Sequence, residues 1–361
     1  MHCGLSYPTW VAFRAATRGF RSRSQVRVVC LVLVLGLIRL QTLAEDQIAI
    51  VGSGSSVPAP LYKQWAEEYQ RLHPAIQVQY LALGTSEGIR QMSRGVGDFG
   101  AGEVPLTAKE RREGSLIELP VMLIGIVPIY NLPDLDRDLR FSGELLADIY
   151  LGRVKTWNSL EIARLNPGVA LPNLPISVIY RPAGKGSNYV FTDFLSKTSS
   201  RFRTQIGPSP SPAWPVGAPA ERSSDMVDKV KQAPGAIGYV ELQFAMHAYV
   251  RYGLVLNPSG KFVKASAQTV MAACNAVENP GWDKYSVSLT NVPGADSFPI
   301  TSFTWLYVRT NLAKDPKRSA ALLNLINWML SDGQNIGARL GYASLPETLR
   351  FKTKALVDSL H

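Results

Sequence analysis

The chain has 361 residues, of which 46% are hydrophobic, and 38 lysines and arginines stand against 28 acidic residues for a formal net charge of +10. This length and composition are typical of a globular protein of two domains or one large one. The first 44 residues contribute six of the ten net positive charges, so the basic balance is no argument for nucleic-acid binding by the remainder.

The first 44 residues have the pattern of an export signal. They hold six arginines, no lysine and no acid, and an apolar run at 28–38 precedes Thr42-Leu43-Ala44. This pattern predicts a secretory signal peptide over residues 1–44. A membrane anchor is the alternative, but 11 apolar residues are fewer than the roughly 20 that span a bilayer. After cleavage only Cys274 remains, so no internal disulfide can form and stability must come from core burial.

Strands and helices alternate in the first half of the remaining chain. Apolar residues at helical spacing predict a helix around Leu61 to Leu72, and alternation predicts strands on either side. The apolar stretch Leu116 to Leu132 contains Pro120, Gly125 and Pro128, which favours consecutive strands over a helix. This βαβ pattern predicts an α/β fold with parallel sheets. The strands expected here are 48–51, 76–83 and the broken run 116–132, and a helix is expected to begin at Ile89.

The second half is less regular, because proline-rich loops separate its elements. Helices are expected at 145–151, 188–195 and 269–277, strands at 176–180, 236–240 and 303–308, loops at 167–175 and 207–220, and a long final helix from Ala320.

Three junctions between a predicted strand and a predicted helix are rich in glycine and small hydroxyl residues. They are 52–58, 84–88 and 181–187, and the last begins with Arg181. Helix N-termini present unpaired N–H groups and partial positive charge, which attract anions. Arginine can add two parallel hydrogen bonds to an oxyanion. The sequence therefore predicts a receptor for an oxyanion.

Catalytic and metal-binding signatures are missing from the sequence. The three histidines after the leader have no partner at metal-ligand spacing, and no G-x-S-x-G motif is present. The stretch 184–187, Gly-Lys-Gly-Ser, lacks the upstream glycine and the Lys-Ser/Thr pair of a phosphate loop. We therefore expect no catalytic residue, no metal site and no cofactor, and we do not expect an enzyme.

Several ordered blocks resemble one protein family. They span Ile48 to Leu349 and include Pro58-Ala59-Pro60-Leu61-Tyr62, Asp98-Phe99-Gly100-Ala101, Asp148-Ile149-Tyr150-Leu151-Gly152, Pro234 to Glu241 and Tyr342-Ala343-Ser344-Leu345-Pro346. This set is similar to the periplasmic phosphate-binding proteins of bacterial phosphate ABC transporters.

The resemblance implies a fold and a function. The fold is the α/β, two-lobe periplasmic binding protein fold (type II), with a hinge between the lobes. Lobe one is expected at 45–126 plus 298–361, and lobe two at 127–297. The implied protein is a periplasmic monomer that captures inorganic phosphate between its lobes. It delivers phosphate to an inner-membrane ABC permease and its ATPase subunits, without a role for nucleic acid.

The resemblance also implies the residues that bind phosphate. They are Ser56, Val57, Thr85, Glu103, Arg181, Lys185, Gly186 and Ser187. Glu103 stands where the family has aspartate, Lys185 replaces a small donor, and Ala183 replaces an acid that orients the arginine. Together the changes at 183 and 185 make the pocket about two charges more positive.

A carboxylate beside an anion is explained if the ligand brings a proton, because the carboxylate can accept a hydrogen bond from P–OH. Sulfate has no such proton, so Glu103 would act as a filter through repulsion. The departures leave two alternatives open. One is a receptor for another oxyanion or a small phosphate ester, and the other is a secreted phosphatase-like or phosphate-sensing protein on the same fold.

Overall fold

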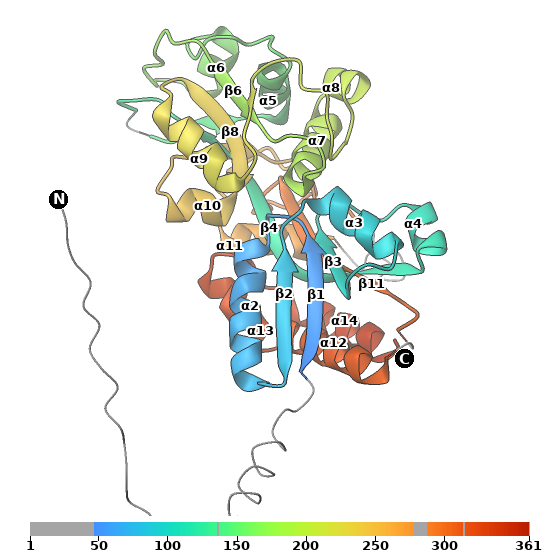
Figure 1. Ribbon diagram of the computed structural model, residues 1–361. Coiled ribbons are helices and arrows are strands. Elements are labelled where there is room, and N and C mark those ends of the chain that lie inside the picture. The colour runs from blue at the N-terminus through green and yellow to red at the C-terminus, as the bar shows by residue number, and fades with distance from the viewer. Residues whose placement is uncertain (1–46, 136, 278–286, 313–314, 361) are drawn as a thin grey trace, which may run out of the picture. The chain divides into compact units, whose positions relative to one another are not determined.

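A mixed sheet of eight strands organises the described part of the chain (Figure 1). The computed structural model describes residues 47–135, 137–277, 287–312 and 315–360, so the predicted signal peptide lies outside it. The strand order is β2-β1-β3-β11-β4-β8-β6-β7, and a small second sheet has the order β10-β9-β5.

From β1 to β4 strands and helices alternate, as the sequence predicts, and later the order is less regular. The strands are β1 (Ile48–Gly54), β2 (Ile76–Leu81), β3 (Phe99–Gly102), β4 (Leu116–Tyr130), β5 (Arg140–Phe141), β6 (Ser177–Tyr180), β7 (Ala218–Pro219), β8 (Ala236–Glu241), β9 (Leu254–Leu256), β10 (Phe262–Val263) and β11 (Thr301–Arg309). The helices are α2 (Ala59–Leu72), α3 (Thr85–Ser93), α4 (Ala108–Glu113), α5 (Gly143–Tyr150), α6 (Leu160–Leu165), α7 (Gly186–Thr198), α8 (Ser200–Gln205), α9 (Ser223–Gln232), α10 (Leu242–His247), α11 (Ala267–Asn275), α12 (Pro316–Met329), α13 (Gly333–Arg339) and α14 (Glu347–Asp358).

Strand β4 is one continuous strand of 15 residues, where the sequence predicted several. Its first part pairs with β11 as far as Gly125, and its last five residues pair with β8 from Ile126 onward. Pro120 is tolerated because the β11 register shifts opposite it, between Thr304 and Trp305, so the missing N–H falls at an irregularity of the ladder. β4 therefore changes its pairing partner from β11 to β8 after Gly125.

The sheet is mixed, whereas the βαβ pattern predicted parallel sheets. β1 pairs in parallel with β2 and β3, and β6 pairs in parallel with β7 and β8. The long strands β4 and β11 run antiparallel to their neighbours. The prediction of parallel pairing is confirmed for β1 with β2 and β3 and for β6 with β7 and β8. It is wrong for every pairing that β4 and β11 make in this sheet.

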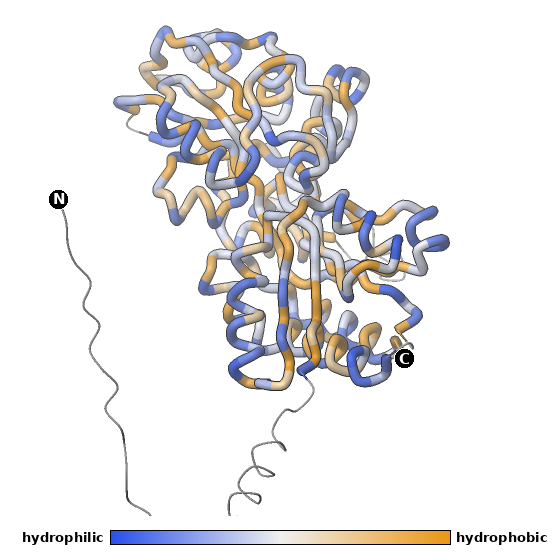
Figure 2. The backbone as a smooth tube through the Cα atoms, in the orientation of Figure 1, coloured by the Kyte–Doolittle hydropathy of each residue, from blue (hydrophilic) through white to orange (hydrophobic). Residues whose placement is uncertain are grey.

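Helix α2 shows how the apolar pattern fixes the packing. Leu61, Tyr62, Trp65 and Tyr69 lie on one face and are each no more than 1% exposed. The indole N–H of Trp65 donates to the carbonyl of Gly333 at 2.8 Å, which ties the helix to the C-terminal region. Apolar segments follow the central strands in Figure 2, while the helices alternate between polar and apolar positions.

The long final helix expected from Ala320 is interrupted. α12 ends at Met329, and α13 and α14 follow as separate helices. Gly341 has φ +87, a conformation that breaks a helix and that glycine adopts without strain, and Pro346 precedes α14. None of the described helices combines the length and the apolar character that spanning a bilayer requires.

Candidate anion site

Four polar residues, of which Glu103 and Arg181 were predicted, lie where two pairs of parallel strands end. Ser55 follows β1 and Glu103 follows the neighbouring β3, while Arg181 follows β6 and Glu241 ends the neighbouring β8. The carboxyl ends of parallel strands are the usual place of ligand sites in α/β folds. Two groups of polar side chains, one from each half of the sheet, are thereby brought to one region.

The three glycine- and serine-rich junctions open helices whose first turns have no side-chain cap. The N-cap positions of α2, α3 and α7 are Pro58, Gly84 and Lys185, and none accepts a capping bond through its side chain. Ser56 and Thr85 are therefore not the N-caps of these helices. Except for those of Ala59 and Ser86, which donate to the carbonyls of Ser56 and Gly184, the backbone N–H groups of these first turns can face an anion, as the sequence predicted.

Arg181 is a buried cation held by neutral groups. Its side chain belongs to a residue that is 1% exposed, and its Nη2 and Nη1 donate to the hydroxyls of Ser56 at 3.2 Å and Ser223 at 3.4 Å. Its backbone N–H donates to the Tyr239 hydroxyl at 3.1 Å. Among the described residues no carboxylate forms an ion pair with Arg181, and its Nε has no hydrogen-bond partner. A buried charge without a counter-ion is costly, so this site calls for an anion.

Glu103 faces two hydroxyl donors on its own side of the site. Ser55 Oγ donates to Glu103 Oε2 at 2.7 Å, and Thr85 Oγ1 donates to the same oxygen at 3.2 Å. Burial raises the pKa of Glu103 to about 8, with a further contribution from the charge of Glu241, while the two hydroxyls act in the opposite direction. At neutral pH the empty site therefore holds Glu103 mainly as a neutral acid.

The two sides of the site touch at the openings of α3 and α7. The N–H of Ser86 donates to the carbonyl of Gly184 at 3.3 Å. A Cβ placed on Gly186 would lie 1.8 Å from Glu103 Oε2 and 2.6 Å from Thr85 Oγ1. Only glycine fits at this position, because any side chain would overlap the carboxylate opposite.

Two predicted residues have other partners in this structure. The Val57 N–H donates to the Ser55 hydroxyl at 3.1 Å, so it is already engaged. Lys185 lies 3.8 Å from Glu221, which is itself 72% exposed, and forms no ion pair with Glu103. Burial, followed by the charge of Arg181, lowers the pKa of Lys185, and Glu221 opposes that shift.

Ser187 completes the predicted set as an unpartnered donor. The residue is 1% exposed, and its hydroxyl has no hydrogen-bond partner among the described residues. Buried polar groups are normally satisfied. The orphaned Ser187 Oγ, Arg181 Nε and Glu103 Oε1 are therefore places where a bound ligand could supply the missing bonds.

Sequence reasoning missed three polar residues of this region. Ser55 precedes the predicted Ser56, and Glu241 is the last residue of the block Pro234 to Glu241 that carries the resemblance. Both lie at strand ends, where ligand sites of α/β folds are expected, so their positions could have indicated them. Ser223 opens α9 and meets Arg181 across 42 residues of sequence. No local pattern indicates that contact, since only the fold brings the two together.

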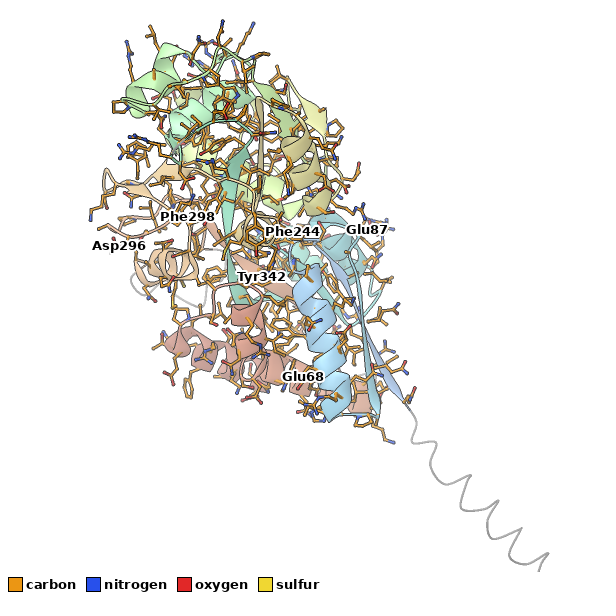
Figure 3. All side chains as sticks on the ribbon, turned by 90° about the vertical axis from the view of Figure 1, so that its left-hand side faces the viewer. Glu68, Glu87, Phe244, Asp296, Phe298 and Tyr342 are labelled. Carbon is orange, nitrogen blue, oxygen red and sulfur yellow. The ribbon has the colours of Figure 1, made fainter. Side chains whose placement is uncertain are left out.

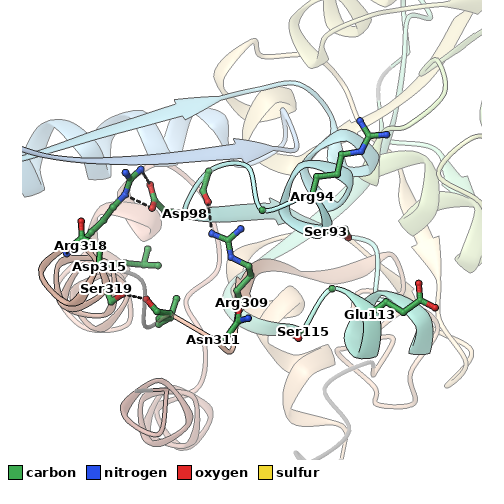
Figure 4. A pocket seen from close by; sticks show the side chains of 15 residues that line it. Ser93, Arg94, Asp98, Glu113, Ser115, Arg309, Asn311, Asp315, Arg318 and Ser319 are labelled. Carbon is green, nitrogen blue, oxygen red and sulfur yellow. Dashed lines mark hydrogen bonds and ion pairs between the residues drawn. The ribbon is translucent and has the colours of Figure 1, made fainter.

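A separate cavity lies elsewhere, at the opposite ends of the β1–β3 strands. It measures about 620 Å³ and lies between the turn after α3, the end of α4 and the start of α12 (Figure 4). Arg318 makes two bonds to Asp98 at 2.6 and 2.7 Å, and Arg309 donates to the Gly97 carbonyl at 3.2 Å. These arginines already have partners, so we do not place the anion there. Among the described residues no group of three His, Cys, Asp or Glu could hold a metal ion.

Comparisons with known proteins show that this chain is similar to phosphate-binding proteins. Residues 41–333 match the family described as the PBP superfamily domain. The phosphate-binding protein PstS of Pasteurella multocida is 32% identical over 333 residues, covering 91% of this chain and 94% of that protein. That of Haemophilus influenzae is 33% identical over 299 residues, covering 82% and 89%. The solved phosphate-binding protein of Stenotrophomonas maltophilia has a TM-score of 0.64 at 16% identity, over 85% of this chain and 93% of that one.

Proposed function

This chain belongs to the PBP superfamily and, within it, to the family of the phosphate-binding proteins PstS, and from that premise we propose that it captures inorganic phosphate at the site around Arg181 and delivers it to an ABC importer. The α/β two-lobe fold expected from the sequence is confirmed by the family match and by the fold of the solved relatives.

The observation that carries the proposal is the buried Arg181 guanidinium. It is 1% exposed, is held only by serine hydroxyls and has no carboxylate partner among the described side chains. An oxyanion would supply the missing charge and accept the free N–H of Nε. Ser56, Thr85, Gly186 and Ser187 would surround the anion from both sides, which makes the site multidentate.

Calorimetry of the protein without its leader tests the proposal. We expect phosphate and arsenate to bind with one site each, because both are tetrahedral and carry a proton that can be donated. Glycerol phosphate is expected to bind more weakly than phosphate, because esterification removes one of the oxygens that the N–H and hydroxyl donors of the site would bind. Failure of phosphate to bind, under conditions in which the protein is folded, would contradict the proposal.

Partners, location and division into lobes belong to the same proposal. We infer a monomer in the periplasm, exported by the 1–44 leader, that docks on an inner-membrane permease with its ATPase subunits. The lobes are proposed at 45–126 plus 298–361 and at 127–297. The change of β4 from β11 to β8 at Gly125 and Ile126 supports the first boundary. We propose no catalytic activity, and the absence of phosphate-ester hydrolysis by the pure protein would agree with this.

Lys185 favours a second candidate function, which is also that of an oxyanion receptor. Its side chain is 18% exposed, and its Nζ lies 3.8 Å from a carboxylate oxygen of the largely exposed Glu221. A receptor for a more highly charged oxyanion than phosphate would use this extra cation. Pyrophosphate in the same calorimeter distinguishes the two candidates, because only the second predicts that it binds more tightly than phosphate.

The pKa of Glu103 predicts how selectivity depends on pH. Below about pH 8 its neutral carboxyl can donate to any oxyanion, including sulfate. As the pH rises through 8, the carboxylate repels sulfate, whose affinity should fall by about tenfold per pH unit, as expected for loss of one proton. Hydrogen phosphate can donate its own proton to the carboxylate, so its affinity should fall less. The ratio of phosphate to sulfate affinity therefore rises with pH.

Titrations of both anions between pH 6 and 9.5 measure this ratio. The Glu103→Gln protein, which cannot titrate at this position, should show a flat sulfate profile. A wild-type ratio that does not change with pH would mean that Glu103 is not the filter.

A further inference from the structure

Two fully buried side chains hold the backbone of Arg181 on both sides. The Arg181 N–H donates to the Tyr239 hydroxyl at 3.1 Å, and the Arg181 carbonyl accepts from the side-chain amide of Asn188 at 3.1 Å. The Tyr239 hydroxyl in turn donates to Asn188 Oδ1. These three hydrogen bonds close a ring, which we call the Arg181 ring, through both backbone groups of Arg181.

The surroundings of Asn188 require an amide at this position. Its Nδ2 donates to the carbonyls of Arg181, Pro182 and Pro210 at 3.1, 2.7 and 3.1 Å. Three carbonyls call for a donor, whereas the hydroxyl of Tyr239 calls for an acceptor on the other branch of the side chain. An aspartate would place an oxygen against the three carbonyls, and an apolar residue would leave all of these groups without a partner.

The carbonyl of Pro210 binds the same segment from the loop between α8 and β7. It accepts from the N–H groups of Gly184 at 2.9 Å and Lys185 at 3.2 Å, in addition to the amide of Asn188. The Gly184 N–H also donates to the Ser211 hydroxyl at 3.0 Å. The N–H groups before α7 are thus engaged with the protein, which leaves the first turn of α7 as the part of this opening that can face an anion.

The segment 181–185 also forms the contact with the β3 side of the site. The Ser86 N–H donates to the Gly184 carbonyl at 3.3 Å, and Figure 3 shows the next residue, Glu87 of α3, at the height where the two halves of the molecule meet. Movement of this segment would therefore displace Arg181, the opening of α7 and the contact with α3 together.

The guanidinium of Arg181 has few anchors of its own. Its hydrogen bonds to described residues go to the hydroxyls of Ser56 at 3.2 Å and Ser223 at 3.4 Å, and among those residues no carboxylate forms an ion pair with it. An arginine has to be held in one geometry to direct two N–H groups at an oxyanion. The direction of this side chain consequently depends on how firmly its backbone is fixed.

We propose that Asn188 and Tyr239 are positioning residues of the anion site, whose side chains fix Arg181 against the opening of α7 without contacting the ligand. The Arg181 ring orders this side of the site before the anion arrives, so less of the binding free energy is used to order the protein. The inference rests on the proposed function, because the ligand is the same oxyanion, and it assigns the affinity in part to residues outside the contact with that ligand.

Phosphate calorimetry of the Tyr239→Phe protein tests the inference. The new ring can keep the stacking on Phe191, whose centroid lies 4.2 Å from that of Tyr239, but the Arg181 N–H loses its acceptor. At a temperature well below the Tm, we expect phosphate to bind about tenfold more weakly than to the wild type. Wild-type affinity in Tyr239→Phe overturns the inference.

Tyr130→Phe is the matched control for this substitution. The Tyr130 hydroxyl is also buried and also accepts a backbone N–H, that of Leu139 at 2.8 Å. Its removal should lower the Tm by a similar amount and leave phosphate affinity unchanged. An equal loss of affinity in both proteins would show a general loosening of the fold and would overturn the inference.

A second matched pair tests the amide. Asn166 holds Arg140 in the same way, because its Oδ1 accepts the Arg140 N–H at 2.8 Å and its Nδ2 donates to the Arg140 carbonyl at 3.0 Å. Asn188→Ala should weaken phosphate binding at least about tenfold, whereas Asn166→Ala should bind like the wild type. Equal affinities in these two proteins contradict the inference, and if Asn188→Ala does not fold, Tyr239→Phe decides.

The Nε–H signal of Arg181 in a nitrogen-15 NMR spectrum gives a readout that a merely structural role would not move. It is identified as the signal that is lost in Arg181→Ala. In the empty Tyr239→Phe protein it should be broadened or shifted, and saturating phosphate should return it to the position of the phosphate-bound wild type. In Tyr130→Phe it should stay at the wild-type position. An unchanged signal in empty Tyr239→Phe overturns the inference.

The two proposals can fail separately. Phosphate binding by the wild type is recorded first, and its absence would count against the proposed function. The Arg181 signal of the empty proteins would then still show whether Tyr239 fixes the arginine.

Discussion

The Arg181→Ala protein is expected to fold normally and to bind phosphate at least about a hundredfold more weakly than the wild type. Two charge-assisted hydrogen bonds to the anion would be lost, each worth roughly 1.5–3 kcal/mol. The fold should tolerate the change, because the hydrogen bonds of the Arg181 side chain to described residues go to the hydroxyls of Ser56 and Ser223. Removing a buried charge without a counter-ion should leave the Tm of the empty protein unchanged or raise it.

Calorimetry and thermal unfolding measure the two effects side by side. Arg318→Ala is the matched control, because it removes an arginine that is paired with Asp98 at the distant cavity. That protein should bind phosphate like the wild type. Wild-type phosphate affinity in Arg181→Ala would show that the site has been placed wrongly.

The Gly186→Ala protein is expected to retain its fold and to bind phosphate roughly 5- to 150-fold more weakly. The added methyl group would overlap Glu103 Oε2 at 1.8 Å and Thr85 Oγ1 at 2.6 Å, so α7 could not approach the β3 side. Overpacking of this kind costs about 1–3 kcal/mol. Since alanine favours a helix more than glycine does, α7 itself should not be destabilised.

A double substitution identifies the cause of this loss. Glu103→Asp shortens the opposing side chain by one methylene, so Gly186→Ala should cost less in that background. Gly260→Ala is the control, because a Cβ there meets no heavy atom within 4 Å, although its φ of +77 strains the loop. Equal losses in the two backgrounds would mean that contact with Glu103 is not responsible.

The sequence predicted those site residues that lie in a short segment directly after a strand. Thr85 and Gly186 sit in glycine-rich junctions and begin α3 and α7, a few residues before the expected helix starts at Ile89 and Asn188. Arg181 was singled out by its place at the third junction and Glu103 through the family resemblance, and the structure brings each of them next to a predicted neighbour, Ser56 and Thr85. Their roles as phosphate ligands stay predictions.

What the sequence did not predict depends on contacts between distant segments. Ser223 meets Arg181 only because β7 and α9 fold back on β6. No local pattern indicates a partner for Lys185, and the structure places Glu221 beside it. The continuity of β4 was hidden because a proline in a strand usually ends it, and only the irregular pairing with β11 makes Pro120 acceptable.

The position of β11 has a consequence for the order of folding. This strand comes from residues 301–309, yet it lies between β3 and β4 in the middle of the sheet. Until these residues are available, both neighbours keep an unpaired edge, and such edges associate with other chains. Contacts between positions about 200 residues apart also form slowly. We therefore expect the edges of β3 and β4 to remain unpaired in the nascent chain until its last quarter has been made.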